Sequence, residues 1–240
     1  MTIEDFQLSI VNSTQRVEAH GFALVPSVLD AAWIERLLAA IEHADPELQF
    51  RRRGGLRHVA SRVPAVAELA ASLQIRDLVE PVLSSEAHLA RSLLFDKTAA
   101  ANWNVAWHQD LTLAVRKRVE VPGYTAWSVK DGVPHVQPPD EVLQRMLAVR
   151  IHLDDCGPEN GALRVLPGSH REGRLSDDDI DRWRSNVPEV LCTARAGDVL
   201  LMRPLLLHAS SAAVSPAHRR VLQFEFGAGP LPAGLHWFGG

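Results

Sequence analysis

The chain has 240 residues, of which 46% are hydrophobic, so it can bury a full core, and we expect one domain over residues 1–240. Its formal net charge is -4 with acids and bases interspersed, which argues against nucleic-acid and membrane-surface partners. Cys156 and Cys192 are too few for a disulfide framework, and there is no run of about 20 apolar residues or signal-like N-terminus. These features predict a cytoplasmic protein that acts on a small molecule and leave its oligomeric state open.

The first third of the chain predicts a short strand and several helices. Residues 1–16 are expected to be a frayed lead-in, and residues 21–26 to form a strand ended by proline. Apolar residues at helical spacing predict a helix capped by Asp30, and one broken or two short helices over residues 64–83. We expect these helices to flank a sheet.

From residue 88 onward the pattern changes to short apolar runs separated by turn sequences, which favours strands. A side-chain cap at Ser176 followed by acidic residues predicts one short helix that ends before Pro188. Seven or eight strands with turns between them are typical of a sandwich or barrel, so the expected fold class is mainly β. The predicted strands are 88–96, 105–114, 146–154, 162–167, 190–194, 198–209 and 219–226.

The segment between Ala114 and Val142 fits no regular element, because prolines and glycines interrupt it repeatedly. It follows directly on the predicted strand 105–114. We therefore predict an active-site lid loop over residues 116–140, with Tyr124 and Trp127 contacting the substrate. An ordinary surface insertion is the alternative interpretation.

An imidazole and a carboxylate stand two residues apart in Trp107-His108-Gln109-Asp110-Leu111. Residues i and i+2 of a strand point to the same face, so His108 and Asp110 share one face while the bulky apolar neighbours share the other. Two such side chains on one face are candidate ligands of a metal ion. Two ligands alone hold a metal poorly, so a third is expected elsewhere.

His208 is the preferred third ligand, since it lies in an apolar run that predicts a buried strand. His152 competes with it, because its strand alternation also directs it toward the interior. Two histidines and one carboxylate form the facial triad of non-haem Fe(II) oxygenases, which leaves three coordination positions open. His108, Asp110 and His208 are therefore the predicted metal ligands and catalytic centre.

An arginine and a serine follow His208 at positions that favour carboxylate binding. Ser210 shares the face of His208, and Arg219 opens the last predicted strand on the face of Gln223. A guanidinium binds a carboxylate through two parallel hydrogen bonds. The adjacent Arg220 falls on the opposite face of that strand, together with three apolar residues, Leu222, Phe224 and Phe226.

Several motifs together resemble the phytanoyl-CoA hydroxylase-like family of Fe(II)/2-oxoglutarate dioxygenases over about residues 17–227. Each motif is weak alone, but their order and spacing are specific. The motifs are Gly21 to Leu29 with its following helix, Trp107-His108-Gln109-Asp110, Leu153-Asp154-Asp155 through Asn160-Gly161-Ala162-Leu163, Pro167-Gly168-Ser169-His170, Gly197-Asp198-Val199-Leu200, and His208-Ala209-Ser210 followed by Arg219.

This resemblance implies a double-stranded β-helix, the cupin-like jelly roll, as the core, with the N-terminal helices beside it. It implies that His108, Asp110 and His208 bind Fe(II), and that Arg219 and Ser210 hold the distal carboxylate of 2-oxoglutarate. The implied reaction uses O2, converts 2-oxoglutarate to succinate and CO2, and oxidises a small-molecule substrate. Related halogenases lack the carboxylate ligand, so the presence of Asp110 favours hydroxylation of an aliphatic C–H bond, or another oxidation, over halogenation.

The substrate itself is not specified by any motif. Arg150, the Arg57-His58 segment and Lys97 are candidate contacts for an anionic substrate group, and a structural ion pair is the alternative for each. Two other functions stay open: a metal-binding jelly roll without catalytic activity, and a zinc hydrolase, since two histidines and a carboxylate also bind catalytic zinc. The Arg219 and Ser210 pair argues against the first, and the lack of a His-x-x-x-His pair argues against the second.

Overall fold

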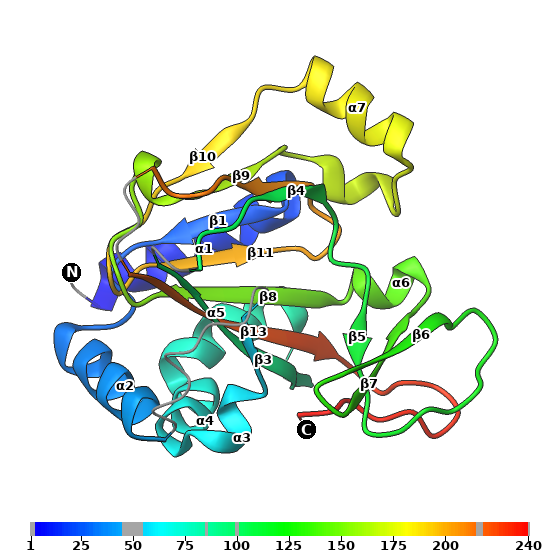
Figure 1. Cartoon of the computed structure of the whole chain (residues 1–240), viewed down its shortest axis with the longest axis horizontal. Coiled ribbons are helices and arrows are strands. Elements are labelled where there is room, and N and C mark those ends of the chain that lie inside the picture. The colour runs from blue at the N-terminus through cyan, green and yellow to red at the C-terminus, as the bar shows by residue number, and fades with distance from the viewer. Residues whose placement is uncertain (1–2, 45–54, 85, 99–100, 215–217, 240) are drawn as a thin grey trace.

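The computed structural model describes residues 3–44, 55–84, 86–98, 101–214 and 218–239 as two facing antiparallel sheets, a small third sheet and a layer of helices (Figure 1). The helices in these ranges are α1 (Ile3–His20), α2 (Ala31–Ala44), α3 (Val59–Arg62), α4 (Pro64–Ala71), α5 (Leu73–Leu83), α6 (Asp140–Leu143) and α7 (Asp177–Asn186). None of them combines the length and apolar character that crossing a bilayer requires.

The strands divide into three sheets whose pairings are all antiparallel. Their order is β1-β11-β8-β13-β3-β2 in the large sheet, β10-β9-β12-β4 in the facing sheet and β5-β7-β6 in the small sheet. An apolar cluster that includes Leu200, Met202 and Val165 fills part of the space between the two larger sheets. The strands are β1 (Phe22–Val25), β2 (Leu56–Arg57), β3 (Ala87–Lys97), β4 (Val105–His108), β5 (Leu113–Ala114), β6 (Thr125–Lys130), β7 (Val133–Gln137), β8 (Met146–His152), β9 (Leu163–Val165), β10 (Val190–Cys192), β11 (Val199–Met202), β12 (His208–Ser210) and β13 (Arg219–Ala228).

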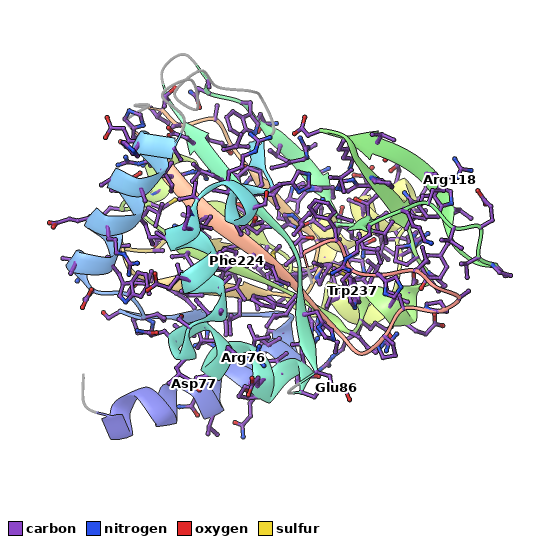
Figure 2. All side chains as sticks on the ribbon, turned by 90° about the horizontal axis from the view of Figure 1, so that it is seen from below. Arg76, Asp77, Glu86, Arg118, Phe224 and Trp237 are labelled. Atoms are coloured by element: carbon purple, nitrogen blue, oxygen red, sulfur yellow. The ribbon has the colours of Figure 1, made fainter. Side chains whose placement is uncertain are left out.

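Strand alternation determines which side chains of the large sheet meet the helices. On β13, Leu222, Phe224 and Phe226 belong to the main core, which they share with residues of α2, α4 and α5. Figure 2 shows Phe224 behind the layer of helices, on the outer face of the sheet. Arg219 and Gln223 occupy the alternate positions and line a pocket between the sheets. The predicted strand phase is therefore confirmed. Because helices cover one face of the large sheet, the fold is mixed α/β with antiparallel sheets.

The N-terminal helices agree with the sequence except at the very start. Asp30 caps α2, where its Oδ1 accepts a hydrogen bond of 2.9 Å from the backbone of Trp33, and residues 64–83 form two helices that meet at Ser72. The expected lead-in over residues 1–16 is wrong from Ile3 onward, since α1 begins there. Val17 of α1 is fully buried. Tertiary contacts of this kind stabilise helices whose apolar residues show little helical periodicity in the sequence.

Two long predicted strands are each divided in the structure. The strand predicted at 105–114 ends at His108, and Leu113–Ala114 joins the small sheet instead. The strand predicted at 198–209 becomes β11 in the large sheet and β12 in the facing sheet. The chain turns between them at Arg203, whose Nη1 donates to the carbonyl of Gln144 at 3.0 Å. The apolar run persists through the break between β11 and β12 because residues 203–207 are all buried, whereas between β4 and β5 only Gln109 is buried.

The segment predicted to lack regular structure contains a β-hairpin. β6 and β7 pair from Thr125 to Gln137, and β7 also pairs with β5, the two-residue strand that follows the metal-ligand motif. The turn is made by Asp131, at φ 49°, and Gly132, at φ 80°. This left-handed backbone suits glycine. The hairpin and the C-terminal segment lie side by side at the right of Figure 1, where Val115 bridges to Trp237.

Candidate metal centre

The two candidate histidine ligands face each other across paired strands. β4 and β12 are neighbours in the facing sheet, and His108 pairs directly with His208. Asp110 follows after β4 has ended, where its backbone N–H donates to the carbonyl of Pro204 at 2.9 Å. The turn brings the carboxylate back toward the histidine rings, so all three side chains converge.

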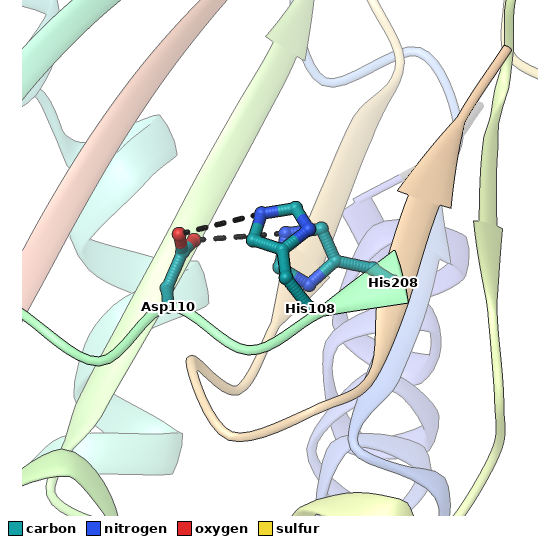
Figure 3. Close-up of side chains that lie close together, drawn as sticks. All are labelled: His108, Asp110 and His208. Atoms are coloured by element: carbon teal, nitrogen blue, oxygen red, sulfur yellow. Dashed lines mark ion pairs between the residues drawn. The ribbon is translucent and has the colours of Figure 1, made fainter. Parts of the chain in front are cut away.

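The geometry of the three side chains suits a single ion. His108 Nε2 lies 3.9 Å from Asp110 Oδ1, and His208 Nε2 lies 3.8 Å from Asp110 Oδ2 (Figure 3). Within the described ranges, this is the one group of three or more histidine, cysteine or acidic residues whose ligand atoms all lie within 4.8 Å of one another. Bonds of about 2.0–2.2 Å from nitrogen and carboxylate oxygen to a metal can close around one ion at such a site.

Backbone hydrogen bonds fix both imidazoles in the orientation that metal binding needs. Nδ1 of His108 lies 2.9 Å from the carbonyl of Ala106, and Nδ1 of His208 lies 2.8 Å from the carbonyl of Leu206. A carbonyl only accepts, so each Nδ1 carries the proton and each Nε2 presents its lone pair. The residues therefore fit a divalent metal without rearrangement of either ring.

The protonation states also favour cation binding. Burial lowers the pKa of His208 to about 4, although Asp110 acts in the opposite direction. Burial alone would raise the pKa of Asp110, but His208 and Arg91 outweigh it, so that pKa lies below its ordinary value. At neutral pH the site offers an uncharged buried imidazole and a carboxylate, which are the forms that bind metal.

The three candidate metal ligands line a pocket of about 110 Å³ between the two large sheets. Four of the residues predicted for carboxylate or substrate binding line it: Lys97, Arg150, Ser210 and Arg219. Apolar walls come from Leu93, Phe95 and Leu163, among others. The structure thus brings together the triad and four polar side chains that come from four different strands.

One end of the pocket gathers cations whose partners are neutral. Lys97 is fully buried, and its Nζ donates to Ser210 Oγ at 3.2 Å and to the carbonyl of Ser211 at 2.6 Å. Arg219 is paired with Lys97 in register, and its Nη1 donates to the carbonyl of Gly161. Burial, and then Arg219, lower the pKa of Lys97 to about 8. Buried cations without a counter-ion are costly, so this end of the pocket suits a carboxylate.

Arg150 lines the same pocket as the triad and the cations. It donates to Gln223 Oε1, and its guanidinium stands 5.4 Å from the centre of the Phe95 ring. Burial, and then Arg219, lower its pKa to about 10. Asp110 acts on it in the opposite direction, so Arg150 experiences both the metal centre and the cationic end.

The other predicted substrate residues lie outside the lining of this pocket. Tyr124 is buried in an apolar cluster with Val136 and Trp237, and Trp127 packs against the same cluster. Arg57 forms an ion pair with Asp131 of the hairpin turn, with Nη1 3.4 Å from Oδ2. All three therefore hold the hairpin or its surroundings in place.

His152, the competing third ligand, does not join the triad. It is buried on the inner face of β8, neither ring nitrogen has a hydrogen-bond partner, and burial lowers its pKa to about 3. Its strand partner is Val221, which faces the interior of the fold, whereas His208 pairs with His108. Strand phase alone could not separate the two histidines, because both point inward.

Gln109 has a role that the sequence motif did not reveal. Its Nε2 donates to the carbonyls of Leu205 at 2.7 Å and Gly173 at 2.8 Å, and its Oε1 accepts from the backbone of Leu175 at 2.9 Å. These bonds tie the turn between His108 and Asp110 to two other segments. The only available sequence signal was its place between two ligands.

We expect Gln109→Leu to weaken metal binding by about tenfold or more, because loss of a side chain that orients metal ligands typically costs 10–100-fold. Titration of the purified protein with Fe(II) or Mn(II), followed by calorimetry, measures the affinity directly. Gln144→Leu is the matched control, since this glutamine is exposed. Equal metal affinity in the two variants would show that the turn is rigid without Gln109.

A 2-His-1-carboxylate triad between antiparallel sheets defines a non-haem metal centre with open coordination positions. Residues 17–221 match the family model described as phytanoyl-CoA dioxygenase (PhyH), so the chain belongs to this family of non-haem Fe/2-oxoglutarate dioxygenases. The predicted family and its cofactors, iron and 2-oxoglutarate, are thereby confirmed at the level of the family.

Characterised relatives include two bacterial ectoine dioxygenases. The protein from Sphingopyxis alaskensis is 26% identical over 183 residues, which cover 67% of this chain and 53% of that protein. The protein from Nocardia farcinica is 25% identical over 233 residues, which cover 83% of this chain and 71% of that protein. The match thus spans about half the length of the first of these relatives.

Solved structures share the fold at lower identity. The alpha ketoglutarate dependent carbocyclase SnoK has a TM-score of 0.71 at 18% identity, with 90% of this chain and 83% of that chain covered. EctD from S. alaskensis with 2-oxoglutarate and 5-hydroxyectoine has a TM-score of 0.69 at 20% identity, covering 90% and 75%. The epimerase SnoN with Fe3+, alpha ketoglutarate and nogalamycin RO has a TM-score of 0.67 at 19% identity, covering 92% and 84%.

Proposed function

We propose that this protein is an Fe(II)- and 2-oxoglutarate-dependent dioxygenase that hydroxylates an aliphatic C–H bond of a small molecule and releases succinate and CO2. The observation that carries the proposal is the placement of a facial triad and a carboxylate-binding cation cluster in one pocket. Asp110 occupies the carboxylate position of the triad, which favours hydroxylation over halogenation.

Each polar side chain of the pocket has a role in this proposal. His108, Asp110 and His208 would hold iron, and Arg219 with Ser210 would hold the distal carboxylate of 2-oxoglutarate. Lys97 donates to Ser210 Oγ, so we assign it to the same carboxylate rather than to the substrate. When bound, iron and 2-oxoglutarate supply the activation of O2. The buried walls of the pocket exclude water from the reaction.

The fold supports the proposal at a coarser level. We infer that the two facing sheets are the halves of a double-stranded β-helix, in which metal ligands on β4 and β12 face the cations of β3, β8 and β13. We also propose that the chain acts as one domain and that the hairpin within residues 116–140 serves as a lid. Its pairing with β5 makes it an ordered lid rather than a loose loop.

The cation cluster separates this function from its two rivals. A non-catalytic metal-binding module has no use for Lys97 and Arg219 buried with neutral partners, and a zinc hydrolase would need a general base instead of a carboxylate-binding end. Both rivals explain the triad alone. Only the oxygenase explains the triad and the cations together.

We expect that anaerobic addition of Fe(II) and then 2-oxoglutarate produces a weak visible charge-transfer band, because a 2-oxoacid chelates iron through two adjacent open positions. Succinate is the control ligand, since it has two carboxylates but no oxo group to complete the chelate. If neither 2-oxoglutarate nor succinate produces the band, or if both produce it equally, the proposal is contradicted. Zn(II) in place of Fe(II) should give no band.

A further inference from the structure

The active pocket has a second polar end that 2-oxoglutarate cannot reach. On β3, Lys97 pairs with Arg219, and six residues earlier Arg91 pairs with Glu225. At about 3.3 Å per residue the two ends lie about 20 Å apart along the strand. Arg91 lines the same pocket as the triad. A five-carbon diacid held at Lys97 and at the metal ends near the metal, so the Arg91 end is left for the substrate.

Arg91 itself is already neutralised. Its Nη2 donates to Glu225 Oε1 at 2.6 Å, and the same oxygen accepts from Gln223 Nε2 at 2.9 Å. Arg91 and Glu225 are both buried, so they form an internal ion pair whose charges cancel. Their contribution to substrate binding is therefore hydrogen bonding and shape, and the net charge of this end depends on its other groups.

The hairpin adds one uncompensated cation. Lys130, the last residue of β6, is half-buried, and its Nζ donates to Thr112 Oγ1 at 3.4 Å, two residues beyond Asp110. Within the described ranges no carboxylate lies within ion-pair distance of Lys130. Burial, and then Arg91, lower its pKa, while Asp110 and Glu225 act in the opposite direction. Strand pairing also places Lys130 near this end, because its neighbour Asp131 is ion-paired with Arg57, which stands opposite Leu93 on β3, two residues from Arg91.

The position of Lys130 is built into the hairpin. Its neighbour Asp131 forms the ion pair with Arg57 of β2, and the turn at Asp131 and Gly132 has left-handed backbone. Arg57 therefore anchors the turn to the edge of the large sheet, and the adjacent ammonium group of Lys130 reaches Thr112, two residues beyond Asp110.

We propose that the substrate is a small molecule carrying a carboxylate or phosphate group, and that Lys130 on the hairpin binds this group beside the Arg91–Glu225 pair. This inference rests on the proposed function, because it uses the iron position to define the substrate end. The charged side chains at that end are two cations, Arg91 and Lys130, and one anion, Glu225. An anionic substrate group would therefore make this end neutral. Asp110 is not included, since it would be occupied by the metal.

The class of substrate is tested with aliphatic carboxylic acids and phosphate monoesters, each paired with the neutral amide or alcohol of the same carbon skeleton. We expect only acids to increase succinate release from 2-oxoglutarate and to shift the visible band of the anaerobic iron complex. Stimulation by the neutral amides or alcohols alone, or by none of the acids, overturns the inference.

The role of Lys130 is tested by Lys130→Met and Lys130→Arg, with Lys117→Met as the control, since Lys117 is exposed on the same segment. With the most active acid, Lys130→Met should raise KM about tenfold or more, because it removes a hydrogen bond to a charged group. Lys130→Arg should restore most of that loss, and Lys117→Met should change nothing. Loss of 2-oxoglutarate affinity in Lys130→Met would instead assign Lys130 to the co-substrate.

Failure of this inference can be told apart from failure of the proposed function. The charge-transfer band with 2-oxoglutarate alone tests the function, and it requires no substrate. If the band forms and acids do not act, the protein is an oxygenase with a different substrate class. If the band does not form, both the proposed function and this inference are wrong.

Discussion

Replacing His208 with alanine is expected to abolish iron-dependent turnover and to reduce iron binding below detection. Each triad residue would supply one of three protein ligands in an open rather than structural site, so the fold should persist. His108→Ala and Asp110→Ala should behave in the same way. Iron content after reconstitution, succinate release and a circular dichroism spectrum together measure binding, activity and fold.

His152→Ala is the matched control for this series, because His152 is also a buried histidine on an inner strand face. It lies outside the triad, so iron binding should remain. Its stability should fall, since the substitution leaves a cavity in a buried position. If His152→Ala loses iron while His208→Ala keeps it, the third ligand has been misassigned.

Arg219→Ala should weaken the binding of 2-oxoglutarate by roughly thirtyfold or more. Truncating one partner of a buried charge pair costs roughly 2 to 5 kcal/mol, and about 1.4 kcal/mol corresponds to tenfold in affinity. Ser210→Ala removes a hydrogen bond to a charged group, so its effect should be smaller. Titration of 2-oxoglutarate into the anaerobic iron complex of each variant gives the dissociation constants.

Arg220→Ala provides the contrast, because the two arginines are neighbours on opposite faces of β13. Arg220 binds Asp154 through two side-chain hydrogen bonds, Nε to Oδ2 at 2.8 Å and Nη2 to Oδ1 at 2.6 Å. Its loss should reduce stability by roughly 1 kcal/mol and change 2-oxoglutarate affinity severalfold at most. A weaker complex for Arg220→Ala than for Arg219→Ala would contradict the observed strand phase.

The parts of the site that follow strand alternation could be predicted from the sequence. The phase of β13 separates Arg219 from Arg220, and the structure places them on the expected faces. His108 and Asp110 were predicted to share a strand face, but β4 ends at His108. They converge because a turn held by Gln109 returns the carboxylate to the histidines. The pattern thus indicated the residues without showing how the backbone joins them.

The hairpin of β6 and β7 could not be predicted from local sequence patterns, for a different reason. Its strands are polar or exposed on one side, and Ala126 and Asp131 adopt positive φ angles that propensity rules assign to glycine. Pairing with β5 and packing against the C-terminal segment stabilise it, and both contacts are distant in sequence. For the same reason the contact between Lys130 and Thr112 could not be predicted from the sequence. Tyr124 and Trp127, which the sequence predicts as substrate contacts, lie in or against an apolar cluster instead.

Gln223 connects the two ends of the pocket. Its Oε1 accepts from Arg150, its Nε2 donates to Glu225, and Glu225 accepts from Arg91. An amide can accept at one atom and donate at the other, so these four side chains form a continuous hydrogen-bonded chain from Arg150 to Arg91. If this hydrogen-bonded chain couples two binding sites, the coupling is reciprocal, and each ligand alters the affinity of the other by the same factor. Gln223→Glu would set two carboxylates against each other and break the chain between Arg150 and Glu225.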